Sequence, residues 1–478
     1  MGRARVLAAD WTWIGDRFEA GLAVAVGEDG RIQAVGAEHE LAWGERASAP
    51  GVREVASRGR ESAPGERALD PGERTAAPGA PVERMAGRAL LPGLVSAHSH
   101  AFQRGLRGRG ESFAGGAGSF WTWREAMYGL VERITAGELE RLSRQAFGEM
   151  RRAGITTVGE FHYLHHGAGG PDWSLDGALL AAARAAGIRL VLLETYYRTG
   201  GIGEPLGPAQ RRFETPGPGP FWEQVDRLAG RLDPATQSLG VAVHSIRAAG
   251  PEDIAAIHGE ARRRGLPVHM HVEEQRREVD EAAARYGRRP MAWILDTLGS
   301  ADGLTAVHCT HTAAGDLARF LDLGGTVCVC PLTEGNLGDG LPELPPAAVA
   351  GGRLCLGSDS NARISMLEEM RWLEYGQRLR RESRGVLSDA RGEVAAALLA
   401  AATTGGARAL GLPAGRIAAG CWADFVALDL AAPALAGWEP DSLPAALVFG
   451  CGEEVIAATC VGGVWSDEAR GKQAARGE

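Results

Sequence analysis

The stretch Leu91-Pro-Gly-Leu-Val-Ser-Ala-His98-Ser-His100-Ala-Phe-Gln103 decides how the rest of the chain is interpreted. A short apolar run, typical of a buried strand, ends in two histidines two positions apart. Because side chains alternate along a strand, both imidazoles face the same side. Such a pair is half of a metal site, although an isolated His-x-His pair is more often structural. The remainder of the chain has to decide between these interpretations.

Strands and helices alternate after this stretch. Apolar residues spaced three to four apart, such as Leu139, Leu142, Ala146 and Met150, indicate helices between the strands. Eight strands are expected, near residues 90–97, 155–161, 188–193, 239–244, 267–272, 304–308, 325–330 and 353–358. Eight strand–helix units predict an α/β fold, a (β/α)8 TIM barrel whose functional residues lie at the carboxyl ends of the strands.

Short alternating strands also precede and follow the predicted barrel, and we expect the two ends to pair in one small β domain. The expected domains are residues 1–88, the barrel over 89–412, and residues 413–478, which include a polar tail. Residues from about 46 to 81 are rich in Pro, Gly, Ala, Arg and Glu. We predict that this segment is a flexible insertion without a catalytic role.

Composition excludes several classes of protein. The formal charge of −9 argues against a nucleic-acid partner. The longest apolar run, Val394 to Ala402, is too short to span a bilayer, and the first residues lack a signal sequence, so we expect a cytoplasmic protein with no membrane partner. Seven cysteines without a C-x-x-C pair argue against a disulfide framework or a structural zinc knuckle.

The distribution of lysine is more informative, because the only lysine is Lys472, close to the end of the chain. A pyridoxal Schiff base, a phosphate-binding P-loop and a carbamylated lysine bridging two metals all need a lysine in the folded core. A metal site in this chain must therefore be built from imidazole and carboxylate.

Residues suited to bind a metal stand at the ends of five predicted strands: His98 and His100, His244, His269 and His271 with Glu274 beyond them, His308, and Asp359. Three imidazoles and one carboxylate suit a single Zn²⁺ or a comparable divalent ion such as Fe²⁺. We assign His98, His100, His271 and Asp359 as ligands, with one position left for water. His269 is expected to pack in the core.

A bound divalent ion lowers the pKa of water to near neutrality and makes it a usable nucleophile. In this interpretation Asp359 accepts the proton of that water, Glu274 carries protons to the leaving nitrogen, and His308 orients the water. The alternatives are a helix-capping role for Asp359 and a solvated position for Glu274.

These residues resemble those of a known family. The chain resembles the mononuclear deaminase branch of the amidohydrolase superfamily in four places: the His98-Ser-His100 strand, the His271-x-x-Glu274 step, His308 and Ser358-Asp359. The two ends resemble the composite β-sandwich of that superfamily. Longer tracts resemble the formimidoylglutamate deiminases, namely His100-Ala-Phe-Gln103-Arg-Gly, Phe120-Trp-Thr-Trp-Arg124-Glu-Ala-Met-Tyr128, Gly159-Glu-Phe-His-Tyr163-Leu-His-His, His244-Ser-Ile-Arg247-Ala and Thr333-Glu-Gly-Asn-Leu-Gly-Asp339-Gly.

The resemblance implies hydrolysis of N-formimino-L-glutamate to N-formyl-L-glutamate and ammonia, a step of histidine degradation, by a homodimer with one Zn²⁺ per subunit. It places Gln103, Arg124, Tyr163, His244 and Arg247 around the substrate. The two arginines suit a small-molecule dicarboxylate, because a guanidinium forms two parallel hydrogen bonds with a carboxylate.

Two other functions are alternatives. The chain could be another deaminase of the same branch, acting on a purine- or adenosine-like ring, but such substrates do not need paired arginines. It could also be a non-catalytic barrel that serves as a binding module. The complete set of candidate ligands argues against this second function.

Overall fold

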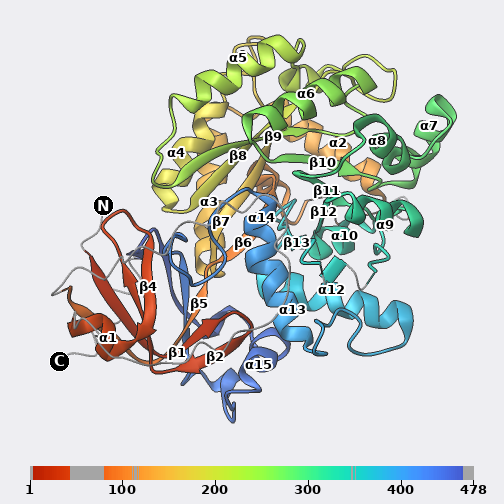
Figure 1. The fold of residues 1–478 in the computed structure, drawn as a ribbon. Helices are drawn as coiled ribbons and strands as arrows, with labels where there is room; N and C mark the ends of the chain where they lie inside the picture. Colours follow the sequence, from red (N-terminus) through yellow and green to blue (C-terminus); the bar gives the residue numbers. More distant parts are fainter. Residues whose placement is uncertain are drawn as a thin grey trace.

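In the computed structural model, residues 4–43, 80–109, 111, 113, 116, 118–345, 348–349 and 351–466 are described. Eight parallel strands form the barrel in the order of the sequence (Figure 1): β6 (Leu94–Ser99), β7 (Ile155–His162), β8 (Arg189–Tyr196), β9 (Gln237–Val243), β10 (Val268–Val272), β11 (Leu304–His308), β12 (Thr326–Val329) and β13 (Leu354–Leu356). A parallel bridge between Ser99 and Asp359 joins the ends of β6 and β13. The predicted (β/α)8 fold is therefore confirmed.

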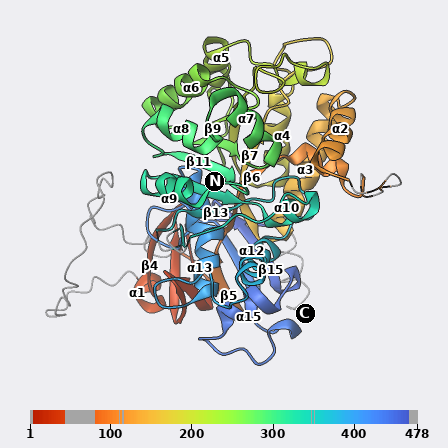
Figure 2. The same cartoon turned by 90° about the vertical axis from the view of Figure 1, so that its right-hand side faces the viewer.

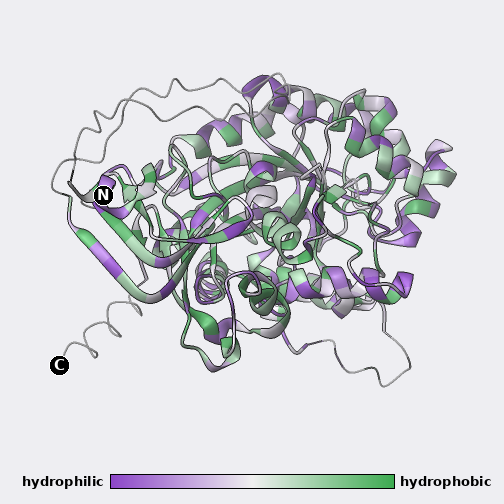
Figure 3. Ribbon diagram, turned by 60° about the horizontal axis from the view of Figure 1, so that its bottom comes forward, coloured by the Kyte–Doolittle hydropathy of each residue, from purple (hydrophilic) through white to green (hydrophobic). Residues whose placement is uncertain are grey.

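Amphipathic helices, with hydrophilic and hydrophobic residues interspersed, surround the barrel (Figure 3), and the strands inside are almost entirely buried. On α3 (Ala136–Arg152), Leu139, Leu142, Ala146 and Met150 are buried, as their spacing predicts. The other helices of the outer layer include α4 (Asp176–Ala186), α5 (Pro218–Ala229), α6 (Pro251–Arg264), α7 (Arg276–Tyr286), α8 (Pro290–Leu298), α9 (Ala314–Asp322), α10 (Pro331–Leu337), α12 (Met366–Arg381), α13 (Val394–Ala400) and α14 (Gly406–Ala409). No helix in the described ranges is long and apolar enough to cross a membrane.

The strand predicted over residues 90–97 is in fact two strands. β5 (Val82–Pro92) belongs to a second sheet, and β6 begins the barrel after Gly93. A Cβ atom at Gly93 would lie 2.0 Å from the Thr156 hydroxyl oxygen. The chain passes between the two sheets at this residue, and glycine provides the close approach that a side chain would prevent.

The second sheet combines both ends of the chain, seen as red and blue strands side by side in Figure 1 and beneath the barrel in Figure 2. Its order is β16-β15-β14-β5-β1-β3-β4, with β2 paired to β1. The remaining bounds are β1 (Arg5–Ile14), β2 (Arg17–Ala20), β3 (Leu22–Val26), β4 (Ile32–Ala37), β14 (Phe425–Asp429), β15 (Ile456–Val461) and β16 (Val464–Trp465). The exact domain limits stay predictions, and the predicted insertion over 46–81 lies outside the described residues except for its last two.

A buried ion pair connects the barrel to this sheet. Asp424 accepts hydrogen bonds from the Arg189 guanidinium at 2.6 and 3.0 Å, and both side chains are about 3% exposed. We expect Asp424→Ala to lower the free energy of unfolding by about 3–5 kcal/mol, because it leaves a buried guanidinium without its counter-ion. Urea unfolding measures this change. Glu19→Ala, which breaks the exposed pair with Arg17, serves as control and is expected to cost less than about 1 kcal/mol; equal losses would contradict the prediction.

Candidate active site

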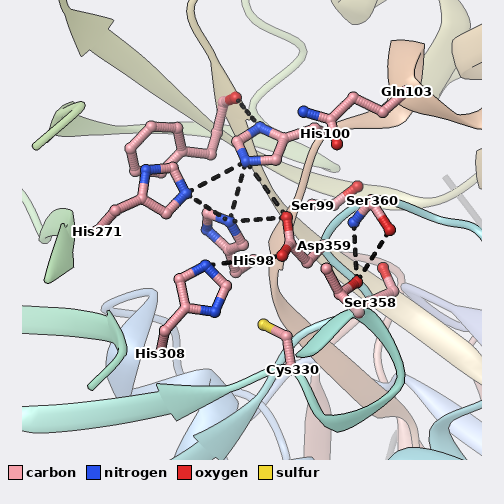
Figure 4. A network of polar contacts seen from close by, with 12 residues as sticks. His98, Ser99, His100, Gln103, His271, His308, Cys330, Ser358, Asp359 and Ser360 are labelled. Atoms are coloured by element: carbon pink, nitrogen blue, oxygen red, sulfur yellow. Dashed lines mark hydrogen bonds and ion pairs between the residues drawn. The ribbon is translucent and has the colours of Figure 1, made fainter. Parts of the chain in front are cut away.

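Three imidazoles meet at the carboxyl end of the barrel (Figure 4). The Nε2 atom of His98 lies 3.1 Å from Nε2 of His100 and 3.2 Å from Nε2 of His271, and the last two atoms are 3.3 Å apart. Asp359 completes the group, because its Oδ1 atom is 3.4 Å from Nε2 of both His98 and His100. The structure thus brings the four predicted ligands together from β6, β10 and the end of β13.

Hydrogen bonds on the far side of two rings set their tautomers. Nδ1 of His100 donates to the Phe161 carbonyl and Nδ1 of His271 donates to the His244 carbonyl, both at 2.9 Å. The Nε2 lone pairs therefore point toward one another. Burial, followed by neighbouring imidazoles, lowers the pKa of His98 and His271 well below the ordinary value, and burial lowers that of His100 to about 3.

This donor set fits a divalent ion. Ligand atoms in a tetrahedral zinc site with bonds of about 2.0–2.1 Å lie about 3.3 Å apart, and the observed spacings are close to that value. Neutral imidazoles clustered in this way repel one another's lone pairs unless a cation lies between them. Asp359 reaches the cluster from a backbone with φ of +42°, held by hydrogen bonds to the backbone of His98 and His100.

Glu274 and His308 lie beside the ligands. Nε2 of His308 is 3.7 Å from Oδ2 of Asp359 and 3.8 Å from Oε1 of Glu274, and its Nδ1 donates to Glu334 at 3.2 Å. Burial alone lowers the pKa of His308, but these carboxylates outweigh it and raise the pKa to about 10. A cation held by the neighbouring ligands would oppose this rise.

Arg247 is buried in an ion-pair network. Its Nη2 atom donates to Oε2 of Glu274 at 2.9 Å, and its Nε atom lies 3.0 Å from Oε2 of Glu278. The sequence predicted Arg247 as a substrate ligand, and the structure adds that this guanidinium also holds the predicted proton carrier Glu274.

The predicted substrate residues line one narrow cavity of about 40 Å³ next to the imidazoles. The Gln103 amide donates to the Tyr163 hydroxyl at 2.9 Å. Arg124 comes from α2 (Phe120–Val131), where its guanidinium lies over the Tyr128 ring at 5.2 Å. The cavity is also lined by His100, His244, Arg247, His271, Glu274, His308 and Asp359. His98 is fully buried beneath it.

Sequence reasoning missed two buried carboxylates. Glu278 lies in the first turn of α7, whereas Glu274 lies in the loop that precedes this helix, so helical spacing gave no signal for the pair. Glu334 lies within a tract that resembles the family, but nothing in its local pattern indicates that it accepts a hydrogen bond from His308. His269 packs as expected, with Nε2 2.9 Å from the Ala409 carbonyl oxygen.

A closed parallel barrel with imidazoles and a carboxylate at the carboxyl ends of its strands defines the class of metal-dependent barrel hydrolases. The chain belongs to the amidohydrolase family, whose sequence pattern matches residues 89–465. It is 41% identical to the formimidoylglutamate deiminase of Pseudomonas aeruginosa strain PAO1, over 80% of this chain and 85% of that protein.

Two other relatives are more distant. A 5-methylthioadenosine/S-adenosylhomocysteine deaminase of Haloquadratum walsbyi is 29% identical over 73% of both chains. The crystal structure of an amidohydrolase from Brucella melitensis has a TM-score of 0.79 and 30% identity, and the alignment covers 99% of both chains.

Proposed function

We propose that this protein hydrolyses N-formimino-L-glutamate to N-formyl-L-glutamate and ammonia. The observation that carries this proposal is the 41% identity to a formimidoylglutamate deiminase over most of both chains. The cavity supports it, because two arginines and a set of hydrogen-bonding side chains surround the position next to the candidate metal ligands.

The divalent ion would be held by His98, His100, His271 and Asp359. We propose Zn²⁺ because the donors are imidazole nitrogen and carboxylate oxygen. When bound, such an ion polarises the formimino group and lowers the pKa of water. Iron in place of zinc, the homodimeric state and the cytoplasmic location stay predictions.

The residues around the ligands handle the protons. The reaction adds the oxygen of water to the formimino carbon, breaks its bond to the terminal nitrogen, and moves two protons from water to that nitrogen. Glu274 is placed to accept a proton and return it to the leaving nitrogen. Its carboxylate is oriented by Arg247 and faces Nε2 of His308 at 3.8 Å, so His308 can orient the attacking water.

The two arginines differ in the charge that they offer to the substrate. Arg247 already contacts Glu274 and Glu278, whereas no carboxylate in the described part of the chain forms an ion pair with Arg124. Arg124 therefore has an uncompensated charge at the wall of the cavity. We assign it to one substrate carboxylate, and we assign Arg247 both to the other carboxylate and to Glu274.

A substrate panel separates this function from its nearest rival. We expect ammonia release from N-formimino-L-glutamate at a kcat/KM at least about 10³-fold above that for 5′-methylthioadenosine or guanine, because a narrow cavity with two guanidiniums favours a slender diacid. A chelator should abolish the release, and added Zn²⁺ should restore it. A preference for the purine or the nucleoside would contradict the proposal.

A further inference from the structure

A second group of histidines and carboxylates lies in the core, between β7, β8 and the start of α4. His162 ends β7, His165 follows in the next loop, Asp176 begins α4, and Glu194 lies in β8. None of these four side chains is more than 2% exposed. None of them lines the candidate active-site cavity.

The polar atoms of this group converge. Oδ1 of Asp176 lies 3.0 Å from Nε2 of His162 and 3.1 Å from Nδ1 of His165. The same Nδ1 atom is 3.3 Å from Oε1 of Glu194. These spacings match those among the candidate ligands of the active site and the value of about 3.3 Å expected for tetrahedral zinc.

The tautomer of His165 indicates that a cation or a proton lies at the centre of this group. Nε2 of His165 lies 2.8 Å from the Thr195 carbonyl oxygen, which can only accept, so Nε2 carries the hydrogen of the neutral ring. The lone pair of Nδ1 then faces two carboxylate oxygens, and all three groups repel one another unless a cation or proton lies between them.

The charges lead to the same conclusion. Neither oxygen of Glu194 receives a hydrogen bond from an N–H or hydroxyl group of the described residues, although the side chain is fully buried. Asp176 receives one hydrogen bond on its other oxygen, from the Gln224 amide. No arginine in the described ranges forms an ion pair with either carboxylate. Two neighbouring buried carboxylates without a cation are very unfavourable.

We propose that His162, His165, Asp176 and Glu194 bind a second divalent ion, Zn²⁺, through Nε2, Nδ1, Oδ1 and Oε1. Four protein ligands make a closed site, which is typical of a structural ion. The Thr195 carbonyl bond to His165 is the outer hydrogen bond that zinc-binding imidazoles usually make. The ion would fix the chain that follows β7, which includes Tyr163 of the candidate active site.

Metal counting tests this proposal on the full-length protein. The protein is equilibrated with Zn²⁺ alone, freed of excess metal and analysed by mass spectrometry of the elements. We expect two zinc ions per chain in the wild type. Glu194→Gln, which keeps the shape of the side chain but removes its charge, should lose one. His271→Asn, the matched control in the active site, should lose the other.

Anomalous scattering at the zinc edge should show a peak between His165 and Glu194 in wild-type crystals. One zinc per chain in the wild type and none in His271→Asn would overturn the proposal, since protons would then balance the charge of the group. If Glu194→Gln does not fold, the count for His271→Asn still decides, with one ion supporting the second site and none rejecting it.

Discussion

Glu274→Gln is expected to lower kcat for N-formimino-L-glutamate by about 10³-fold or more while the metal content of the active site stays unchanged. Glutamine keeps the size of the side chain but cannot carry a proton between water and the leaving nitrogen, and general acid–base catalysis contributes about 10²–10⁴-fold. Metal should be retained because the four candidate ligands are other residues. Steady-state ammonia release and metal analysis on the same sample measure both quantities.

Glu278→Gln is the matched control for this change. Glu278 contacts the same guanidinium as Glu274, is also buried, and does not line the cavity. If the role of Glu274 is proton transfer, the control should lose no more than about tenfold in kcat. Similar losses in both variants would instead mean that Glu274 acts by balancing the charge of Arg247, and the proton carrier would have to be sought elsewhere.

Arg247→Met is expected to lower kcat/KM for N-formimino-L-glutamate by at least about 10²-fold with the metal retained. The change removes a charged hydrogen-bond donor from a desolvated carboxylate of the substrate, and it removes the 2.9 Å partner of Glu274. Unchanged kinetics would exclude Arg247 from the site.

Truncated substrates separate the two tasks assigned to Arg247. N-formiminoglycine lacks the side-chain carboxylate, and N-formimino-4-aminobutyrate lacks the α-carboxylate. If Arg247 binds one of these groups, the wild type should lose activity toward the corresponding truncated substrate, whereas Arg247→Met should hardly distinguish it from the full diacid. An equal loss on all three substrates would show that Arg247 acts only through Glu274.

A count of total zinc does not distinguish the two histidine groups. Both groups lie close to the strand that carries Phe161, with His100 bonded to the Phe161 carbonyl and His162 next to it in the chain. A measurement of total zinc therefore has to be assigned to one group or the other before it is used to judge a variant of the active site.

The sequence by itself determined the barrel, the composite second sheet and the candidate ligands. Strand periodicity is local, so His98 and His100 had to face one side, and parallel strands in one barrel had to bring His271 and Asp359 to the same end. The near absence of lysine was equally decisive, because it removed whole classes of chemistry without any knowledge of the fold.

Only the tertiary structure decided which charges face one another. Three contacts depend on rotamers and on distances across neighbouring strands and helices. They are the pairing of Arg247 with both Glu274 and Glu278, the hydrogen bond from His308 to Glu334, and the approach of His165 to Glu194. The interaction energy of charged groups changes steeply over a few ångströms in a buried environment. Spacing along the chain does not contain that distance, and so these contacts had to be found in three dimensions.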